Sequence, residues 1–159
     1  MKTRIIPKIL SGMAFATVLA LTVTQVSALA ESAQKQQGIE GVWDVRITVV
    51  QCDTGKTILT GRAVLSFSEG GTLTDISDNF LHSASLGTWH HIREQNYTAV
   101  QRFFVFKADG SFAGTQETTL DIELSKKADE YTATATFETF DPTDQLISSG
   151  CATSTATRL

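Results

Sequence analysis

Residues 41–52 read Gly-Val-Trp-Asp-Val-Arg-Ile-Thr-Val-Val-Gln-Cys. Apolar side chains occupy every second position of this stretch, at Trp43, Val45, Ile47 and Val49. A period of two is typical of a β-strand that has one face buried and the other in water. We therefore expect a strand here, with Trp43 facing the interior.

Similar stretches follow along the chain, separated by residues that favour turns, such as Glu69-Gly70-Gly71 and Ala108-Asp109-Gly110. They are rich in Thr, Val, Ile, Phe and Tyr, which suit a pleated surface, and no long helical period competes with them. We predict an all-β fold, an eight-stranded up-and-down antiparallel β-barrel. The expected strands cover residues 42–52, 57–68, 72–77, 87–93, 97–107, 111–124, 130–140 and 146–157. Residues 78–86 are expected to form either a loop over an opening or an ordinary surface loop.

The first thirty residues have a different character. Lys2, Arg4 and Lys8 precede an uncharged apolar run, which ends in Ser27-Ala28-Leu29-Ala30. This order is typical of a secretory signal peptide cleaved after Ala30, and the run is too short and interrupted to be read as a membrane span. The expected organisation is a signal peptide over 1–30, a polar lead-in over 31–40 and a barrel domain over 41–159. We expect a secreted or periplasmic protein.

The charge balance restricts the partners. Without the leader, 10 basic and 17 acidic residues remain, a net charge of −7. Such a surface disfavours nucleic acids and anionic membranes, so we expect no nucleic-acid partner. Because the leader is not read as a membrane span, we also expect no integral membrane insertion, and we expect a monomer or weak oligomer. His90 and His91 are adjacent and point to opposite faces of a strand, while His82 lies in a loop, so we expect no metal site and no cofactor.

The two cysteines test closure of the sheet. In an up-and-down barrel the first and last strands become antiparallel neighbours, so paired residues share a nearly constant sum of residue numbers. The sum is 203 for Cys52 and Cys151, and 201 for Trp43 and Arg158. We predict a disulfide on one face of the sheet and, on the other, an Arg158 guanidinium over the Trp43 indole. The alternatives are an open two-sheet sandwich and two free buried thiols.

Gly41-Val42-Trp43, together with Arg158, resembles the calycin superfamily, which includes lipocalins, fatty-acid-binding proteins and avidins. In lipocalins a Gly-x-Trp opens the first strand and an Arg near the end of the barrel packs across that Trp. The resemblance implies a lipocalin-like barrel in which Trp43 and Arg158 are structural residues at the base. The sequence departs from lipocalins in ending at Leu159, where they continue into a helix. Its two Trp are too few for the aromatic box of avidins, so biotin binding is not carried over.

The same alternation predicts which side chains face the lumen. If Gln95-Asn96 is a two-residue turn, Trp89 pairs with Arg102, and His91 faces Val100 on the same side. The candidate ligand-binding residues in the lumen are Phe67, Trp89, His91, Arg102, Phe104, Phe106 and Gln116.

A mostly apolar interior with a few polar groups is the usual anatomy of a small-ligand pocket. We therefore predict an exported barrel that binds or carries a small hydrophobic or amphiphilic molecule. One alternative is a cyclase or isomerase acting on an apolar substrate, with acid-base chemistry from His91, Arg102 and Glu117, and it predicts a lumen group with a shifted pKa. The other is a packed interaction module with no cavity and an apolar patch on its outer wall.

Overall fold

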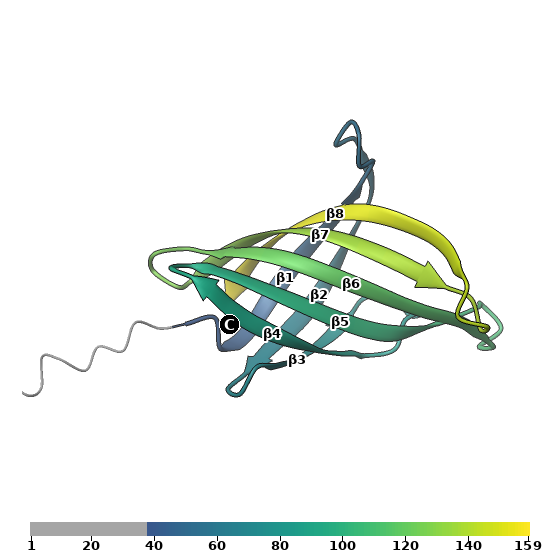
Figure 1. The fold of residues 1–159 in the computed structure, drawn as a ribbon, viewed down its shortest axis with the longest axis horizontal. Helices are drawn as coiled ribbons and strands as arrows, with labels where there is room; N and C mark the ends of the chain where they lie inside the picture. The colour runs from purple at the N-terminus through teal and green to yellow at the C-terminus, as the bar shows by residue number, and fades with distance from the viewer. Residues whose placement is uncertain (1–37) are drawn as a thin grey trace, which may run out of the picture. The chain divides into compact units, whose positions relative to one another are not determined.

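The computed structural model describes residues 38–159, which form a closed barrel of eight antiparallel strands (Figure 1). Each strand pairs with its neighbours in the sequence, and the last returns to the first. The strands are β1 (Gly41–Val50), β2 (Thr57–Ser68), β3 (Thr72–Ser77), β4 (Ser85–Arg93), β5 (Asn96–Phe106), β6 (Phe112–Leu124), β7 (Glu130–Phe140) and β8 (Leu146–Arg158). The predicted fold class is confirmed, and every expected strand boundary lies within two residues of the observed one.

The predicted signal peptide and residues 31–37 of the predicted lead-in lie outside the described residues. Within residues 38–159, no helix has the length and apolar character needed to cross a membrane.

The barrel closes where β1 meets β8. Their register runs from Trp43 opposite Arg158 to Val50 opposite Cys151. Just beyond this ladder Cys52 and Cys151 form a disulfide, with Cα atoms 5.2 Å apart. Both predictions from the residue sums are confirmed, and the open sandwich and the free thiols are wrong.

One end of the barrel is sealed by aromatic packing, and we call it the closed end. Trp43 is fully buried there, and its indole Nε1 donates a hydrogen bond to the Ile39 carbonyl at 2.9 Å. The Arg158 guanidinium lies 4.2 Å from the centre of the Trp43 ring, as expected, and donates to the carbonyls of Gly38, Glu40 and Ala128. These contacts hold the chain entering β1 across the base of the barrel.

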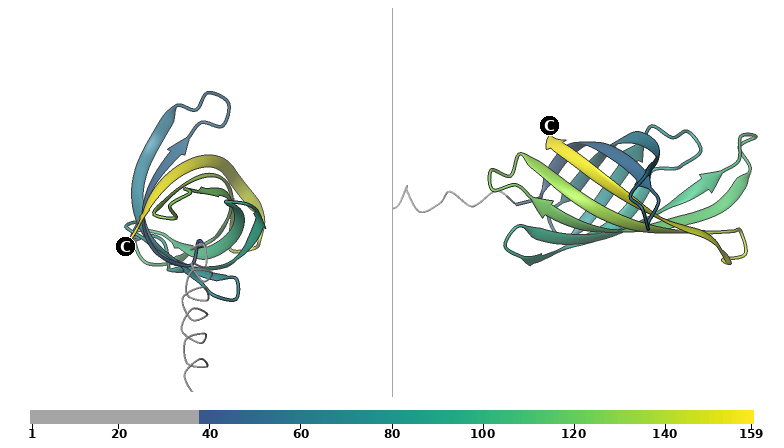
Figure 2. Two further views of the ribbon diagram at one scale, coloured as in Figure 1. Left: turned by 90° about the vertical axis from the view of Figure 1, so that its left-hand side faces the viewer. Right: turned by 90° about the horizontal axis from the view of Figure 1, so that it is seen from above.

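The opposite end, which we call the open end, is bordered by the connections over residues 51–56, 78–84, 107–111 and 141–145. In the left view of Figure 2 the strands enclose a ring around the barrel axis. Aromatic side chains fill the interior near the closed end, where Trp43, Phe67 and Tyr131 are each at most 2% exposed. The half near the open end also carries small side chains, such as Ser77, Ser148 and Ala152, and their small volume leaves space inside.

The β4–β5 hairpin corrects one prediction. The turn lies at Glu94-Gln95, one residue earlier than expected, because Glu94 adopts a positive φ of 50° and a bulge interrupts the ladder between His91 and Arg93. Trp89 consequently pairs with Ala99 and not with Arg102. Because side chains alternate along a strand, this shift reverses the two faces of β5.

The reversal moves two candidate lumen residues to the outer wall. Arg102 pairs with Glu117 of β6 across the outer surface, with 3.4 Å between Nη2 and Oε2. Phe104 is 54% exposed and packs against Phe112. The inward positions of β5 belong instead to Ala99, Gln101 and Phe103.

Residues 78–84 are fastened to the wall of the barrel. The amide of Ser83 donates to the carbonyl of Phe104, and the amide of Phe106 donates to the carbonyl of Leu81. An isolated bridge joins His82 to Val105. The segment therefore continues the sheet beside the end of β5 that lies near the open end.

Candidate functional site: a cavity in the lumen

A cavity of about 560 Å³ occupies the lumen between the closed-end aromatics and the open end. This volume lies within the range of roughly 300 to 1,000 Å³ that small-molecule sites usually have. Its apolar lining includes Val45, Ile47, Leu65, Phe103, Ala135 and Phe137. Its polar lining includes Asp75, His82, Ser85, Gln101, Gln116 and Tyr131.

The centre of the polar lining is Asp75 on β3, which is 7% exposed. Its Oδ2 atom accepts two hydrogen bonds, from Ser85 Oγ and from Gln101 Nε2, each at 3.2 Å. Ser85 is close because it pairs with Asp75 across β3 and β4. Three adjacent strands thus place a carboxylate, a hydroxyl and an amide in one cluster.

Gln101 reaches Asp75 because the residue between them is a glycine. Gly87 of β4 pairs with Gln101 of β5, and a Cβ atom at position 87 would lie 2.1 Å from the Val100 carbonyl oxygen and 2.9 Å from the Gln101 Cβ. Because Gly87 has no side chain, the side-chain amide of Gln101 can extend across β4 to Asp75. Gly87 is therefore part of the architecture of the site.

Within residues 38–159, three buried polar atoms in the cavity wall have no hydrogen-bond partner: Asp75 Oδ1, Gln101 Oε1 and the Tyr131 hydroxyl. Leaving a buried polar group unpaired costs about 1 to 3 kcal/mol, so native interiors contain few of them. Tyr131 is on β7, which lies on the opposite side of the closed strand order from β3. Polar atoms without a hydrogen-bond partner therefore lie on two facing walls of the cavity.

Burial shifts the titration of these groups. It raises the pKa of Asp75, although the hydrogen bonds from Ser85 and Gln101 act in the opposite direction. It also raises the pKa of Tyr131, and the nearby Asp75 carboxylate adds to that shift. Burial lowers the pKa of His82, whose ring lies 4.5 Å from that of Phe103.

Of the candidate lumen residues, Gln116 lines the cavity and accepts a hydrogen bond from Thr139 Oγ1 at 3.3 Å. Phe67 and Trp89 point inward but belong to the closed-end packing, with ring centres 6.1 Å apart. His91 lies beyond Trp89, its Nε2 atom 2.8 Å from the carbonyl oxygen of Glu94. Gln116 therefore lies in the cavity wall, and Phe67, Trp89 and His91 do not.

The remaining candidates, Arg102, Phe104 and Phe106, do not line the cavity. Phe106 packs against Phe112, the neighbour that Phe104 also contacts. Arg102 and Glu117 pair on the outer wall, so they do not face the lumen, where the sequence predicted acid-base chemistry for them. The reversed facing of β5 explains the error for Arg102 and Phe104.

Asp75, Gln101 and Tyr131 were not among the site residues predicted from the sequence. Two signals in the sequence indicated inward positions for Asp75 and Gln101. Leu73 and Asp75 occupy alternate positions of one strand, so they share a face, and Leu73 is buried. A charged Arg102 belongs in water more readily than a neutral Gln101, which favours the observed facing of β5.

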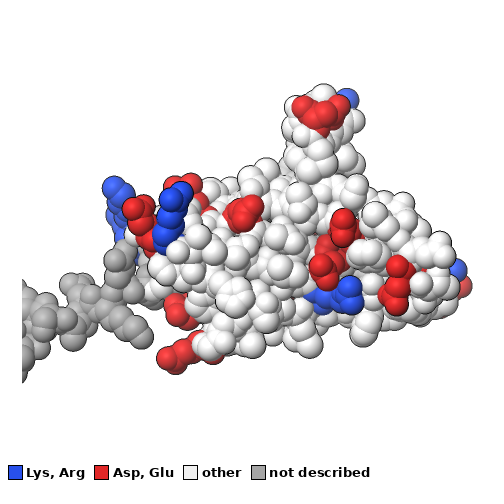
Figure 3. Space-filling view, viewed as in Figure 1, with Lys and Arg blue, Asp and Glu red and all other residues white. Residues whose placement is uncertain are grey.

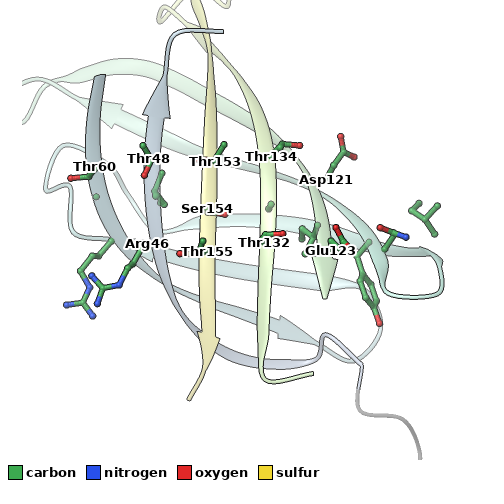
Figure 4. A pocket seen from close by; sticks show the side chains of 18 of the residues that line it. Arg46, Thr48, Thr60, Asp121, Glu123, Thr132, Thr134, Thr153, Ser154 and Thr155 are labelled. Atoms are coloured by element: carbon green, nitrogen blue, oxygen red, sulfur yellow. The ribbon is translucent and has the colours of Figure 1, made fainter. Parts of the chain in front are cut away.

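The outer wall carries a larger but shallower depression of about 1,120 Å³ (Figure 4). Hydroxyls line it, from the half-buried Thr48 and from the exposed Thr60, Thr132, Thr134, Thr153 and Thr155. Arg46 lies on one side and Asp121 and Glu123 lie on the other (Figure 4). None of the buried unpartnered atoms in residues 38–159 belongs to this depression, so the lumen is the better candidate site.

The face seen in Figure 3 shows scattered acidic side chains, few basic ones and broad uncharged areas between them. In the described part of the chain, no three His, Cys, Asp or Glu side chains are grouped closely enough to hold a metal ion.

No protein-family model matches the chain, and neither the curated proteins nor the solved structures contain a significant match to it.

Proposed function

We propose that this barrel binds a small amphiphilic molecule in its lumen. The observation that carries the proposal is the presence of three unpartnered polar atoms in a cavity whose other walls are largely apolar. Asp75, Gln101 and Tyr131 would bind the polar part of the ligand, and side chains such as Ile47 and Phe103 would contact its apolar part. This division matches the composition of known small-molecule sites.

The architecture supports the same proposal by analogy. The closed eight-stranded barrel and the stacked Trp43–Arg158 pair are compatible with a calycin-like protein, and many calycins carry ligands in the lumen. The analogy concerns the fold alone, so we infer binding from the cavity itself. The space in the lumen supports a binding protein over a packed interaction module.

We further propose that the protein acts outside the cytoplasm. A disulfide between Cys52 and Cys151 is consistent with an oxidising compartment, and the sequence pattern over residues 1–30 is that of a leader.

A fluorescent apolar probe tests the binding proposal. N-phenyl-1-naphthylamine should fluoresce more strongly in the presence of the purified protein. Ala135→Trp should reduce the increase, because Ala135 lines the cavity and the indole would occupy part of it. Thr134→Trp is the matched control, since its side chain is exposed on the outer wall of the same strand and should leave the signal unchanged. Equal signals from both variants, or no signal from the native protein, would contradict the proposal.

The second candidate function is acid-base catalysis by Asp75, such as isomerisation or cyclisation of an apolar substrate. Its raised pKa and its position inside the cavity favour this role, because a catalytic acid or base needs a pKa near the working pH. Small molecules extracted from the protein, purified from its source, should be incubated with the native protein and with Asp75→Asn. A new product that forms with the native protein alone indicates catalysis, and unchanged molecules in both indicate carriage.

A further inference from the structure

We propose that the polar part of the ligand is a protonated primary amine, held by Asp75, Gln101 and Tyr131. This inference rests on the proposed lumen-binding function and identifies the chemical class of the ligand.

The unpartnered atoms are mainly acceptors. Gln101 must turn its NH₂ group toward Asp75 Oδ2, because a carboxylate oxygen accepts and does not donate, and this orientation leaves Gln101 Oε1 free. Asp75 Oδ1 is free as well. The two acceptors belong to side chains that are bonded to each other, so both are available to one ligand group.

Tyr131 supplies a third oxygen from the opposite wall. Its ring packs against Trp43 at 4.9 Å and against Phe67 at 6.2 Å, which fixes the side chain at the closed end of the cavity. Both residues line the same cavity, and the negative charge of Asp75 adds to the effect of burial in raising the pKa of Tyr131. An ammonium group has three N–H donors and no acceptor, so its donors match these three oxygens in number and kind.

The charge of the cavity also favours a cation. Asp75 is the buried acid in the wall, and Asp78 adds a second carboxylate near the open end. The basic residue in contact with the cavity, Arg62, is engaged elsewhere, since its guanidinium forms a 2.8 Å ion pair with Asp44 on the outer wall. Burial lowers the pKa of His82, which disfavours its cationic form. A buried carboxylate without a counter-ion is costly, and an ammonium ligand would supply that counter-ion.

Other polar groups fit less well. A carboxylate ligand would bring a further negative charge beside Asp75 and would leave both free acceptors unpaired. An alcohol has a single donor and can satisfy one of them. Charge-assisted hydrogen bonds are also about twice as strong as neutral ones.

The test uses octylamine, 1-octanol and octanoate, which share one tail and differ in the polar group. Binding of each to the native protein at neutral pH is measured by calorimetry. Octylamine, which is protonated at this pH, should bind at least about tenfold more tightly than the other two. Asp75→Asn should remove this preference, and Asp121→Asn, the same substitution at an exposed position of β6, should preserve it.

The outcomes separate the two proposals. If the probes bind without preference for the amine, or if the preference survives Asp75→Asn, the amine assignment is wrong and lumen binding stands. If none of the probes binds and the naphthylamine fluorescence is also unchanged, both proposals are wrong. Binding of the naphthylamine by Asp75→Asn shows that the variant is folded.

Discussion

Removal of the Cys52–Cys151 disulfide should lower the free energy of unfolding by a predictable amount. The bond joins residues 99 positions apart, and loop-closure entropy for a loop of that length gives about 4 to 5 kcal/mol. For a folded domain of about 120 residues, this loss corresponds to a fall in Tm of about 15 to 20 °C. The double variant Cys52→Ser/Cys151→Ser avoids leaving a reactive thiol.

Thermal unfolding followed by circular dichroism measures the fall. The native protein treated with a reducing agent is the control, and its Tm should match that of the double variant, because both lack the cross-link. Naphthylamine binding by the variant should persist below its Tm, since the bond lies on the outer wall. A fall in Tm of less than about 5 °C, or labelling of both cysteines by iodoacetamide in unreduced protein, would refute the reasoning.

Four further variants test the interior and the facing of β5. Burial raises the pKa of Asp75 above 3.8, so the folded state binds more protons than the unfolded state, and the free energy of unfolding falls as pH rises from that value to the folded pKa. Urea unfolding between about pH 4 and pH 7 gives the free energy of unfolding as a function of pH, and Asp75→Asn should flatten this dependence. Parallel pH profiles of the native protein and the variant would contradict the expectation. Phe103→Ala should cost about 3 kcal/mol and Phe104→Ala less than about 1 kcal/mol in the same assay, because the first is 9% exposed and the second 54%. Equal costs would argue against the observed facing of β5. Gly87→Ala should cost more than about 2 kcal/mol and weaken binding, because its Cβ would lie 2.1 Å from the Val100 carbonyl oxygen.

The strands and the closure of the barrel could be predicted from sequence because both depend on local pattern. Alternation in β1 placed Trp43 inside, and the positions of Cys151 and Arg158 in the last strand agreed with one antiparallel register. Two independent pairs of residues pointing to the same register are a stronger signal than either pair alone.

The β4–β5 register could not be predicted because β5 carries apolar side chains on both faces. Phe103 points inward and Phe104 outward, so the hydrophobic pattern does not decide between the two facings. The turn decided it, through the left-handed conformation of Glu94, a residue for which that conformation is uncommon.

The central part of the site was missed for a different reason. A buried Asp75 opposes the general preference of carboxylates for water, and its partners lie on two other strands. Their convergence depends on the register across Gly87, which the sequence pattern does not define. The polar cluster is a property of three strands together.

Leu159 is exposed and its amide donates to the Val42 carbonyl, so the chain finishes at the sealed base, away from the entrance to the cavity. A surface or a fusion partner joined through this residue would leave that entrance unobstructed. Molecules immobilised this way on a sensor chip would all present their binding sites to the flowing solution in the same orientation.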